Sequence, residues 1–196
     1  MKDIFLVDNP DDYLTLVNKS YKLSKEYIPS DLELIDERYS DGNKYLRKKA
    51  KIAFEKMACD IMKIGLKIIA VSTYRSYEYQ GSLFNSYVLD KGYGYADMCS
   101  AKAGCSEHQL GLAVDIANES LDYDNFDKTK EFDWVCDNCY KYGFILRYPK
   151  DKSDITGYKY EPWHYRYIDD IDDIGIAKYI YDNNLTLEEY LSNLKR

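Results

Sequence analysis

The chain has 196 residues, of which 45% are apolar and 31% are charged. This length and composition suit one globular domain whose core needs no disulfide support, so we expect a single domain over residues 1–196. The net charge of −7 argues against nucleic acid or an anionic membrane as a partner, because both require a basic protein surface.

Residues 1–40 are polar, contain Pro10 and Pro29 and have only short apolar runs, which predicts an irregular N-terminal arm. No segment approaches the ~20 apolar residues of a membrane span, and residues 1–8 have too short an apolar core for a signal peptide. The chain as written is therefore expected to be cytoplasmic, or exported and facing the cell wall if a leader has been removed. Its five cysteines show no framework spacing, which favours a reducing compartment.

The next part of the chain predicts two helices on either side of a strand. Apolar residues recur every three or four positions over residues 43–64, which predicts an amphipathic helix that ends at Gly65. Residues 66–72 are apolar and β-branched and predict a buried strand. Ser76 is a suitable N-cap for a second helix, which is expected to run to about Asp90.

The second half of the chain begins with residues 92–105, where three glycines and the lack of a period predict a long loop. Residues 112–116 alternate between larger apolar and other side chains, which predicts a strand that carries Asp115. Residues 130–142 predict a helix closed by Gly143. The remaining predicted elements are a strand over 144–147, a polar turn over 148–160, a strand over 161–168 and two C-terminal helices, marked by the stripe Ile171, Ile174, Ala177 and Ile180 and by a capping box over 186–189.

The chain contains two histidines, and each lies in a short segment rich in reactive groups. His108 shares residues 106–116 with Asp115, and His164 lies within residues 161–167. A single histidine is more often structural, but a carboxylate inside an apolar strand is costly unless it is paired or bound to a metal. Two imidazoles and one carboxylate are typical ligands of catalytic zinc, which keeps a fourth position for water. Together these residues indicate a zinc hydrolase.

Glu161 is the candidate for the base that a zinc hydrolase needs to accept a proton. In a regular strand Glu161 and His164 would point to opposite faces. Pro162 interrupts the strand ladder between them and permits a bend that would aim both at one cleft.

Several motifs occur together between residues 65 and 170. They are Tyr74-Arg75-Ser76 with Gln80, Ser106-x-His108-x-x-Gly111-x-Ala113-x-Asp115, Tyr142-Gly143-Phe144-Ile145-Leu146-Arg147-Tyr148-Pro149, Ile155-Thr156-Gly157, and Glu161-x-Trp163-His164-x-Arg166-Tyr167. Taken together, they resemble the zinc D,D-carboxypeptidase family of VanY and VanXY type, including its L,D-carboxypeptidase relatives. Any one motif alone would be weak, but the combination is highly specific.

The resemblance implies a Zn²⁺ ion bound by His108, Asp115 and His164, with Glu161 as general base and later as proton donor to the leaving amine. It also implies that Arg75 lies at the active site and holds the substrate or the developing oxyanion, which suits a planar guanidinium. The remaining expected roles are substrate binding by Gln80 and Ser106, a cleft wall or core position for Trp163, and a structural ion pair for Arg166.

We therefore expect an α+β fold with a small, mainly antiparallel sheet, packed helices and a zinc cleft. The expected function is hydrolysis of the C-terminal D-alanine from peptidoglycan stem peptides or D-Ala-D-Ala-ended precursors. The alternative is a D-Ala-D-Ala dipeptidase, or a bifunctional dipeptidase and carboxypeptidase, of vancomycin-resistance type. A peptidoglycan endopeptidase ranks lower. A hedgehog-like zinc-binding module also ranks lower, because Glu161 and Arg75 are both retained and a protein that only binds needs no general base.

Two cysteine pairs require separate interpretation. Cys99 and Cys105 flank the segment before the first metal motif and would be able to bridge in an exported protein. Cys136 and Cys139 lie on the apolar stripe of a predicted helix and lack the second pair of ligands that a structural zinc site needs. Core packing is therefore the expected role of the second pair.

Overall fold

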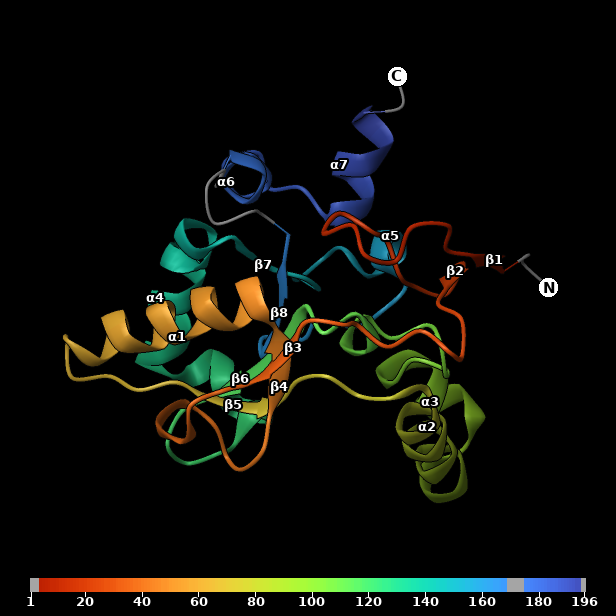
Figure 1. The fold of residues 1–196 in the computed structure, drawn as a ribbon, viewed down its shortest axis with the longest axis horizontal. Coiled ribbons are helices and arrows are strands. Elements are labelled where there is room, and N and C mark those ends of the chain that lie inside the picture. The colour runs from red at the N-terminus through yellow and green to blue at the C-terminus, as the bar shows by residue number, and fades with distance from the viewer. Residues whose placement is uncertain (1–3, 169–174, 195–196) are drawn as a thin grey trace.

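A four-stranded antiparallel sheet forms the centre of the structure (Figure 1). The computed structural model describes residues 4–168 and 175–194 of the chain. The strands of this sheet are, in spatial order, β5 Ile69–Ser72, β6 Ala113–Ala117, β8 His164–Tyr167 and β7 Phe144–Leu146. Every neighbouring pair runs antiparallel, which confirms the predicted α+β fold with a small, mainly antiparallel sheet.

The two central strands, β6 and β8, are buried along their whole length. In β6 the predicted alternation separates two environments, because successive side chains of a strand point to opposite faces. Val114 and Ile116 belong to the main hydrophobic core, whereas Asp115 lines a cleft on the other face. The alternation therefore places a carboxylate in the cleft without exposing the core.

The helix α1, Lys48–Met62, buries an apolar stripe in the main core. The predicted start of this helix near residue 43 is wrong, because Tyr45–Arg47 forms strand β4. This strand pairs antiparallel with β3, Leu32–Leu34. Leu46 lies four residues before Ala50, a spacing that suits a helix face, and only the pairing with a distant strand decides against it.

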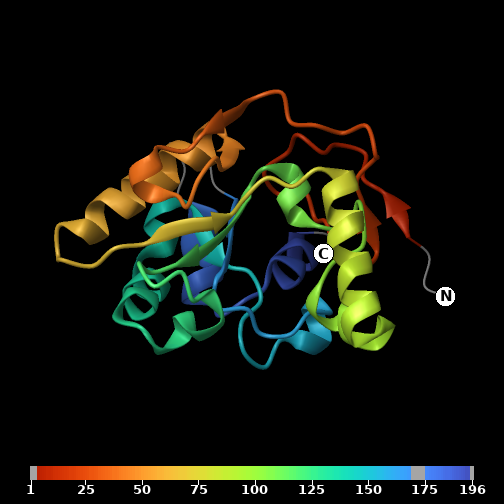
Figure 2. The ribbon, with the colours of Figure 1, turned by 90° about the horizontal axis from the view of Figure 1, so that it is seen from below.

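The larger helices lie on different sides of the central sheet (Figures 1 and 2). Both views show α1 and α4 at one end of the molecule and α2 and α3 at the other. The bounds of the remaining helices are α2 Tyr77–Lys91, α3 Tyr93–Cys99, α4 Lys130–Asn138, α5 Ser153–Thr156, α6 Gly175–Asp182 and α7 Leu187–Leu194. No helix within the described ranges combines the length and apolar character needed to cross a membrane.

Two predicted helix starts are confirmed by their capping contacts. The hydroxyl of Ser76 accepts a hydrogen bond from the backbone N–H of Tyr79 at 3.1 Å and begins α2. The side chain of Glu189 accepts from the backbone N–H of Thr186 at 2.8 Å, and the Thr186 hydroxyl accepts from the Glu189 N–H at 3.1 Å. This reciprocal pair is a capping box and begins α7.

The predicted loop over residues 92–105 is wrong for its first half, which forms α3. Gly92 ends α2 with φ at +83° and allows the chain to turn directly into α3. The rings of Phe84 and Tyr93 lie 6.0 Å apart between centroids and join the two helices. Helix packing therefore stabilises a segment whose sequence has no helical period, because tertiary contacts override local propensity.

Smaller corrections apply to three other segments. The predicted helix over residues 130–142 divides into α4 and a 3₁₀ helix, Cys139–Tyr142, before Gly143 at φ +75°. The polar turn over residues 148–160 contains the one-turn helix α5. In the C-terminal stripe, Ala177 and Ile180 are buried on α6, while Ile171 and Ile174 lie outside the described residues.

The N-terminal arm contributes side chains to the main core. Besides β3, it contains the short strands β1 Phe5–Leu6 and β2 Tyr21–Lys22, which pair in parallel. Val17, Leu23 and Ile35 are buried in the same hydrophobic cluster as the strands of the central sheet. The arm therefore packs as part of the structure that supports the cleft.

All five cysteines are free thiols. Cys139 is buried in the main core, and the half-buried Cys136 has its sulfur 3.6 Å from the hydroxyl oxygen of Tyr165. Burial raises the pKa of the Cys136 thiol to about 11, so this thiol stays protonated at neutral pH. Cys139 therefore serves packing, as the apolar stripe predicted, and core packing by Cys136 stays a prediction.

Gly111 lies two residues before β6, and a substitution at this position tests the turn that leads into the strand. Its φ is +67°, and an added β-carbon would lie 2.8 Å from Cδ2 of Leu32 and 3.1 Å from Cγ of Arg47. We expect Gly111→Ala to lower the free energy of unfolding by about 1–3 kcal/mol, because left-handed strain and steric overlap add together. Denaturant unfolding followed by circular dichroism measures this loss.

Gly94→Ala is the matched control. Gly94 lies within α3, and nothing lies within 4 Å of an added β-carbon. This variant should be neutral or more stable by up to ~1 kcal/mol, because alanine favours helix. Equal losses of stability in the two variants would contradict the special role of Gly111.

Candidate metal centre and active site

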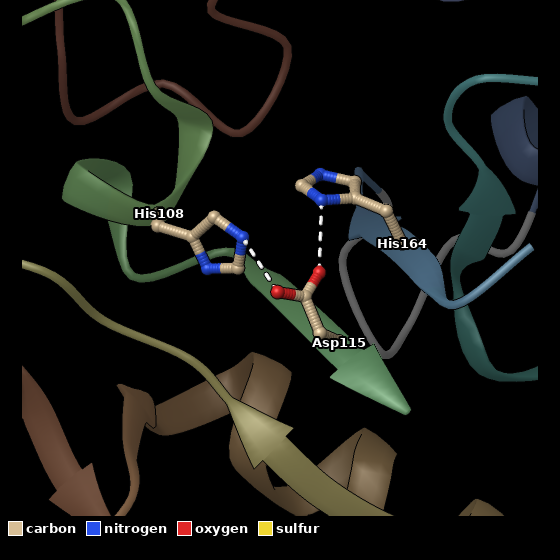
Figure 3. Close-up of side chains that lie close together, drawn as sticks. All are labelled: His108, Asp115 and His164. Carbon is tan, nitrogen blue, oxygen red and sulfur yellow. Dashed lines mark ion pairs between the residues drawn. The ribbon is translucent and has the colours of Figure 1, made fainter. Parts of the chain in front are cut away.

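The pairing of β6 with β8 brings two of the candidate ligands together. Asp115 on β6 lies directly opposite His164 on β8 in the strand register. Directly opposed residues of antiparallel strands project from the same face of the sheet. The carboxylate and the imidazole therefore point toward one another, as Figure 3 shows.

His108 reaches the same point from a 3₁₀ helix, Glu107–Leu110. The hydroxyl of Ser106 accepts a weak hydrogen bond from the backbone N–H of His108 at 3.4 Å at the start of this helix. Gly111 ends it in the left-handed conformation and directs the chain into β6. Glycine suits this position because a β-carbon is disfavoured there.

The three candidate ligands form a tight, buried cluster. Nε2 of His108 lies 3.3 Å from Oδ2 of Asp115, and Nδ1 of His164 lies 3.0 Å from Oδ1. One ligand atom from each residue can be chosen so that all three lie within 4.8 Å of one another. This is the only such group of three or more potential ligands among the described residues. The donor set and its compactness suit a single metal ion.

The imidazole of His108 is oriented by a contact of its Nδ1, the ring nitrogen that points away from Asp115. Its Nδ1 lies 2.7 Å from the backbone carbonyl oxygen of Thr73, which follows β5. Because a carbonyl oxygen only accepts, Nδ1 carries the proton and donates it. Nε2 then keeps its lone pair toward Asp115, which is the form that binds a metal.

Burial and neighbouring charges set the protonation of both histidines. Burial, reinforced by Arg75, lowers the pKa of His108 to about 4, so this ring is neutral at neutral pH. Burial also lowers the pKa of His164, but the carboxylates of Asp115 and Glu107 outweigh it and raise this pKa to about 9. A metal that binds His164 must therefore displace a proton.

Asp115 carries the negative charge at the centre of the cluster. Burial raises its pKa, but the interactions with His108, His164 and Arg75 outweigh burial and hold this pKa well below its usual range. Its Oδ2 accepts a hydrogen bond from Nη2 of Arg75 at 2.7 Å. Its Oδ1 is buried, makes no hydrogen bond of good geometry among the described residues and faces Nδ1 of His164 at 3.0 Å. A buried carboxylate oxygen in this state is well suited to a metal ligand.

Glu161 lies in a turn immediately before β8. The predicted strand over residues 161–168 begins only at His164, whose backbone N–H donates to the Glu161 carbonyl oxygen at 3.2 Å. This turn, rather than a bent strand, places Oε2 of Glu161 3.8 Å from Nδ1 of His164. Burial raises the pKa of the Glu161 carboxyl group to about 7.

Arg75 is held by three neighbours at the edge of the cluster. Besides its contact with Asp115, it donates from Nε to Oγ of Ser72 at 2.9 Å and from Nη1 to Oε1 of Gln80 at 3.2 Å. The amide nitrogen of Gln80 donates in turn to the carbonyl oxygen of Ala101 at 2.7 Å. Both ends of the Gln80 amide are thus engaged by the protein, and Gln80 positions Arg75.

All the predicted site residues line one cleft. Ser106 and Trp163 line it together with the three candidate ligands, Glu161, Arg75 and Gln80. Trp163 is half-buried, and its ring packs edge-on against Tyr123 with 5.3 Å between centroids. Substrate binding by Gln80, Ser106 and Trp163 stays a prediction.

Sequence reasoning missed two features of the site. Five tyrosines line the cleft: Tyr79, Tyr87, Tyr123, Tyr148 and Tyr158. Their only signal was the total of 22 tyrosines, which does not tell which of them face a cleft. The second feature is Glu107, a buried carboxylate next to His108 in the chain.

The match to a family model spans all three candidate metal ligands. The model described as VanY, D-alanyl-D-alanine carboxypeptidase, matches residues 43–170. The chain belongs to the VanY family. As a VanY-family member it is a carboxypeptidase, and the resemblance predicted from its motifs is confirmed.

Two curated relatives extend this likeness over most of the chain. YodJ of Bacillus subtilis (strain 168), named as a carboxypeptidase, is 46% identical over 97% of this VanY-family chain and 71% of its own length. VanXYC of Enterococcus gallinarum is named as a bifunctional D-Ala-D-Ala dipeptidase and D-Ala-D-Ala carboxypeptidase. It is 35% identical over 90% of this chain and 92% of its own length.

Solved structures share the same fold. The LdcB LD-carboxypeptidase superposes with a TM-score of 0.88 at 45% identity and covers 96% of this chain and 90% of its own. VanYB in complex with D-alanine-D-alanine gives 0.78 at 32% identity, with coverages of 92% and 97%. A VanY mutant in complex with Zn(II) gives 0.77 at 32% identity, with coverages of 91% and 98%.

Removal of one of the three candidate ligands should weaken metal binding. His164→Ala leaves two candidate ligands, too few to hold a catalytic zinc ion firmly, so we expect it to lose its metal on dialysis. Elemental analysis of protein reconstituted with zinc measures the metal-to-protein ratio. Unchanged zinc content in this variant would remove His164 from the ligand set.

Glu119→Gln serves as the control for metal loss. Glu119 lies two residues after the end of β6, is exposed and pairs only with Lys67 among the described ion pairs. This change removes a carboxylate without touching the cluster. The zinc content of the control should therefore equal that of the wild type.

Proposed function

We propose that this VanY-family chain is a zinc carboxypeptidase that removes the C-terminal D-alanine from peptidoglycan stem peptides or D-Ala-D-Ala-ended precursors. One observation carries the proposal: His108, Asp115 and His164 converge in a cleft that also contains Glu161 and Arg75. The likeness to the solved LdcB LD-carboxypeptidase and to VanYB solved in complex with D-alanine-D-alanine supports the substrate class.

His108, Asp115 and His164 would hold the zinc ion. Their two imidazole nitrogens and one carboxylate oxygen match the three protein ligands of catalytic zinc sites. When bound, zinc polarises a carbonyl group and lowers the pKa of water. The buried surroundings of the cluster keep the imidazoles and the carboxylate in fixed positions, so little reorganisation is needed when a substrate binds.

Glu161 is the residue that moves protons. Its carboxyl group lies in the same cleft and is held by the turn before β8, within 3.8 Å of Nδ1 of His164. In this position it accepts the proton of the attacking water and later returns it to the departing amine of D-alanine. General acid–base catalysis by one positioned group typically contributes about 10²–10⁴-fold to the rate.

Arg75 supplies positive charge on the side of the cleft formed by β5 and α2. Its side chain is fixed by Ser72, Gln80 and Asp115 and still lines the cleft. A guanidinium held in this way can bind the terminal carboxylate of the peptide or stabilise negative charge on the carbonyl oxygen under attack. Trp163 and the cleft tyrosines provide apolar surface for the rest of the peptide.

A second candidate is a bifunctional dipeptidase and carboxypeptidase. The 35% identity with VanXYC, which extends over 92% of that protein, supports this second candidate function. Both activities require the same metal ligands and proton carrier. They differ in whether the cleft accepts a free dipeptide or only the end of a longer peptide.

The substrate class is tested with three peptides. Zinc-loaded protein is incubated with D-Ala-D-Ala, a pentapeptide stem and a tetrapeptide stem, and released D-alanine is measured. Release from the pentapeptide indicates D,D-carboxypeptidase activity, release from the tetrapeptide indicates L,D-carboxypeptidase activity, and cleavage of the free dipeptide supports the second candidate. Release from none of them would overturn the proposal.

Glu161→Gln tests the proton carrier. The amide keeps the size of the side chain but cannot accept a proton, so turnover should fall by about 10²–10⁴-fold. The zinc content should stay at the wild-type level, because Glu161 is not among the three proposed ligands. Glu119→Gln is again the matched control and should keep full turnover. Wild-type turnover in Glu161→Gln would exclude this residue from the mechanism.

A further inference from the structure

Glu107 is a fully buried carboxylate next to the cluster formed by His108, Asp115 and His164. Its side chain is 0% exposed, and its Oε1 accepts hydrogen bonds from Nε of Arg147 at 2.8 Å and from Nη1 of Arg166 at 2.9 Å. Both arginines are also fully buried. Two charged donors on one oxygen fix the plane of the carboxylate and leave its second oxygen to face another group.

The second oxygen of Glu107 faces the proposed ligand His164. Oε2 lies 3.5 Å from Nε2 of His164, and both atoms are buried without a hydrogen-bond partner among the described residues. The opposite ring nitrogen, Nδ1, faces Asp115 and Glu161. The imidazole of His164 thus has Asp115 and Glu161 on its Nδ1 side and the fixed Oε2 of Glu107 on its Nε2 side.

We propose that Glu107 is a positioning residue for the metal centre: its Oε2 accepts the Nε2 proton of His164 and so keeps the Nδ1 lone pair directed at the metal. This inference rests on the proposed zinc function. In a neutral imidazole only one nitrogen carries the proton, so a carboxylate that accepts from Nε2 selects the tautomer in which Nδ1 is free to coordinate.

The two arginines that hold Glu107 are in turn held by segments outside the metal motifs. Arg147 also donates to both carboxylate oxygens of Glu188 on α7, at 2.7 and 2.8 Å. Arg166 donates to the backbone carbonyl oxygens of Tyr13 and Thr15 in the N-terminal arm, at 2.9 and 3.0 Å. The arm and the last helix therefore hold the carboxylate that orients His164.

His108 has a matching support of a different kind. The backbone carbonyl oxygen of Thr73 accepts from its Nδ1 at 2.7 Å and leaves Nε2 toward Asp115. The two proposed imidazole ligands would therefore coordinate through different nitrogens, His108 through Nε2 and His164 through Nδ1. Each is fixed by an acceptor on its opposite nitrogen.

The first experiment observes these nitrogens directly. The chain has only two histidines, so protein labelled with ¹⁵N-histidine gives signals from two imidazoles. With zinc bound, we expect His164 to show a metal-bound Nδ1 and a protonated Nε2, and His108 to show the reverse. Coordination of His164 through Nε2 would overturn the proposal.

The second experiment changes the acceptor. In Glu107→Gln the two arginines retain the amide oxygen, so the NH₂ group faces Nε2 of His164 and opposes a donor with a donor. We expect zinc affinity, measured by competition with a chelator, to fall by about 10–100-fold, the usual effect of losing an outer-shell partner. Wild-type zinc affinity in this variant would also overturn the proposal.

Glu188→Gln is the matched control because it removes a carboxylate from the other side of Arg147. Thermal unfolding should show that both variants are less stable, since each weakens a buried ion pair. Only Glu107→Gln should weaken zinc binding; equal weakening in the control would show that the effect is structural. If zinc shifts neither imidazole of the wild type, the proposed metal function itself fails, which is a separate outcome.

Discussion

The antiparallel pairing of β6 with β8 is the constraint on which the candidate active site depends. It sets Asp115 opposite His164, and their neighbours Val114 and Tyr165 are opposed in the same register and buried in the main core. A slip of one residue would exchange the two faces and bury the ligands where the core should be. The alternation that builds the core therefore also fixes the geometry of two of the three proposed ligands.

A second constraint is the group of buried charges next to His164 on β8. Glu107, Arg147 and Arg166 lie in the interior, where an unpaired charge would cost several kcal/mol. Their mutual pairing, completed by Glu188 and by carbonyl oxygens of the arm, offsets that cost. Segments that carry no catalytic motif thus contribute to the electrostatics of the site. Such a network also orders the ring of His164, since the imidazole lies against one of its oxygens.

The cleft combines groups from separate parts of the fold. Arg75 follows β5, Asp115 lies on β6, and Glu161 lies in the turn before β8. Solved relatives named as LD-carboxypeptidase, D,D-pentapeptidase and D,D-dipeptidase share this fold, so the fold alone does not set the substrate. We propose that specificity arises from the side chains that line the cleft, such as Trp163 and Tyr123.

The sequence by itself determined the family, the strands of the central sheet and the choice of His108, Asp115 and His164 as candidate metal ligands. Residue chemistry, motif spacing and period-two alternation are local properties and were sufficient for this. It did not determine that Leu46 lies on a strand, that residues 93–99 form a helix, or that Glu107 faces a metal ligand. Each of these depends on contacts between segments far apart in the chain: β3 against β4, α2 against α3, and two arginines around one carboxylate. Only the tertiary structure brings such partners together, because the free energy of those pairings is absent from any local stretch of sequence.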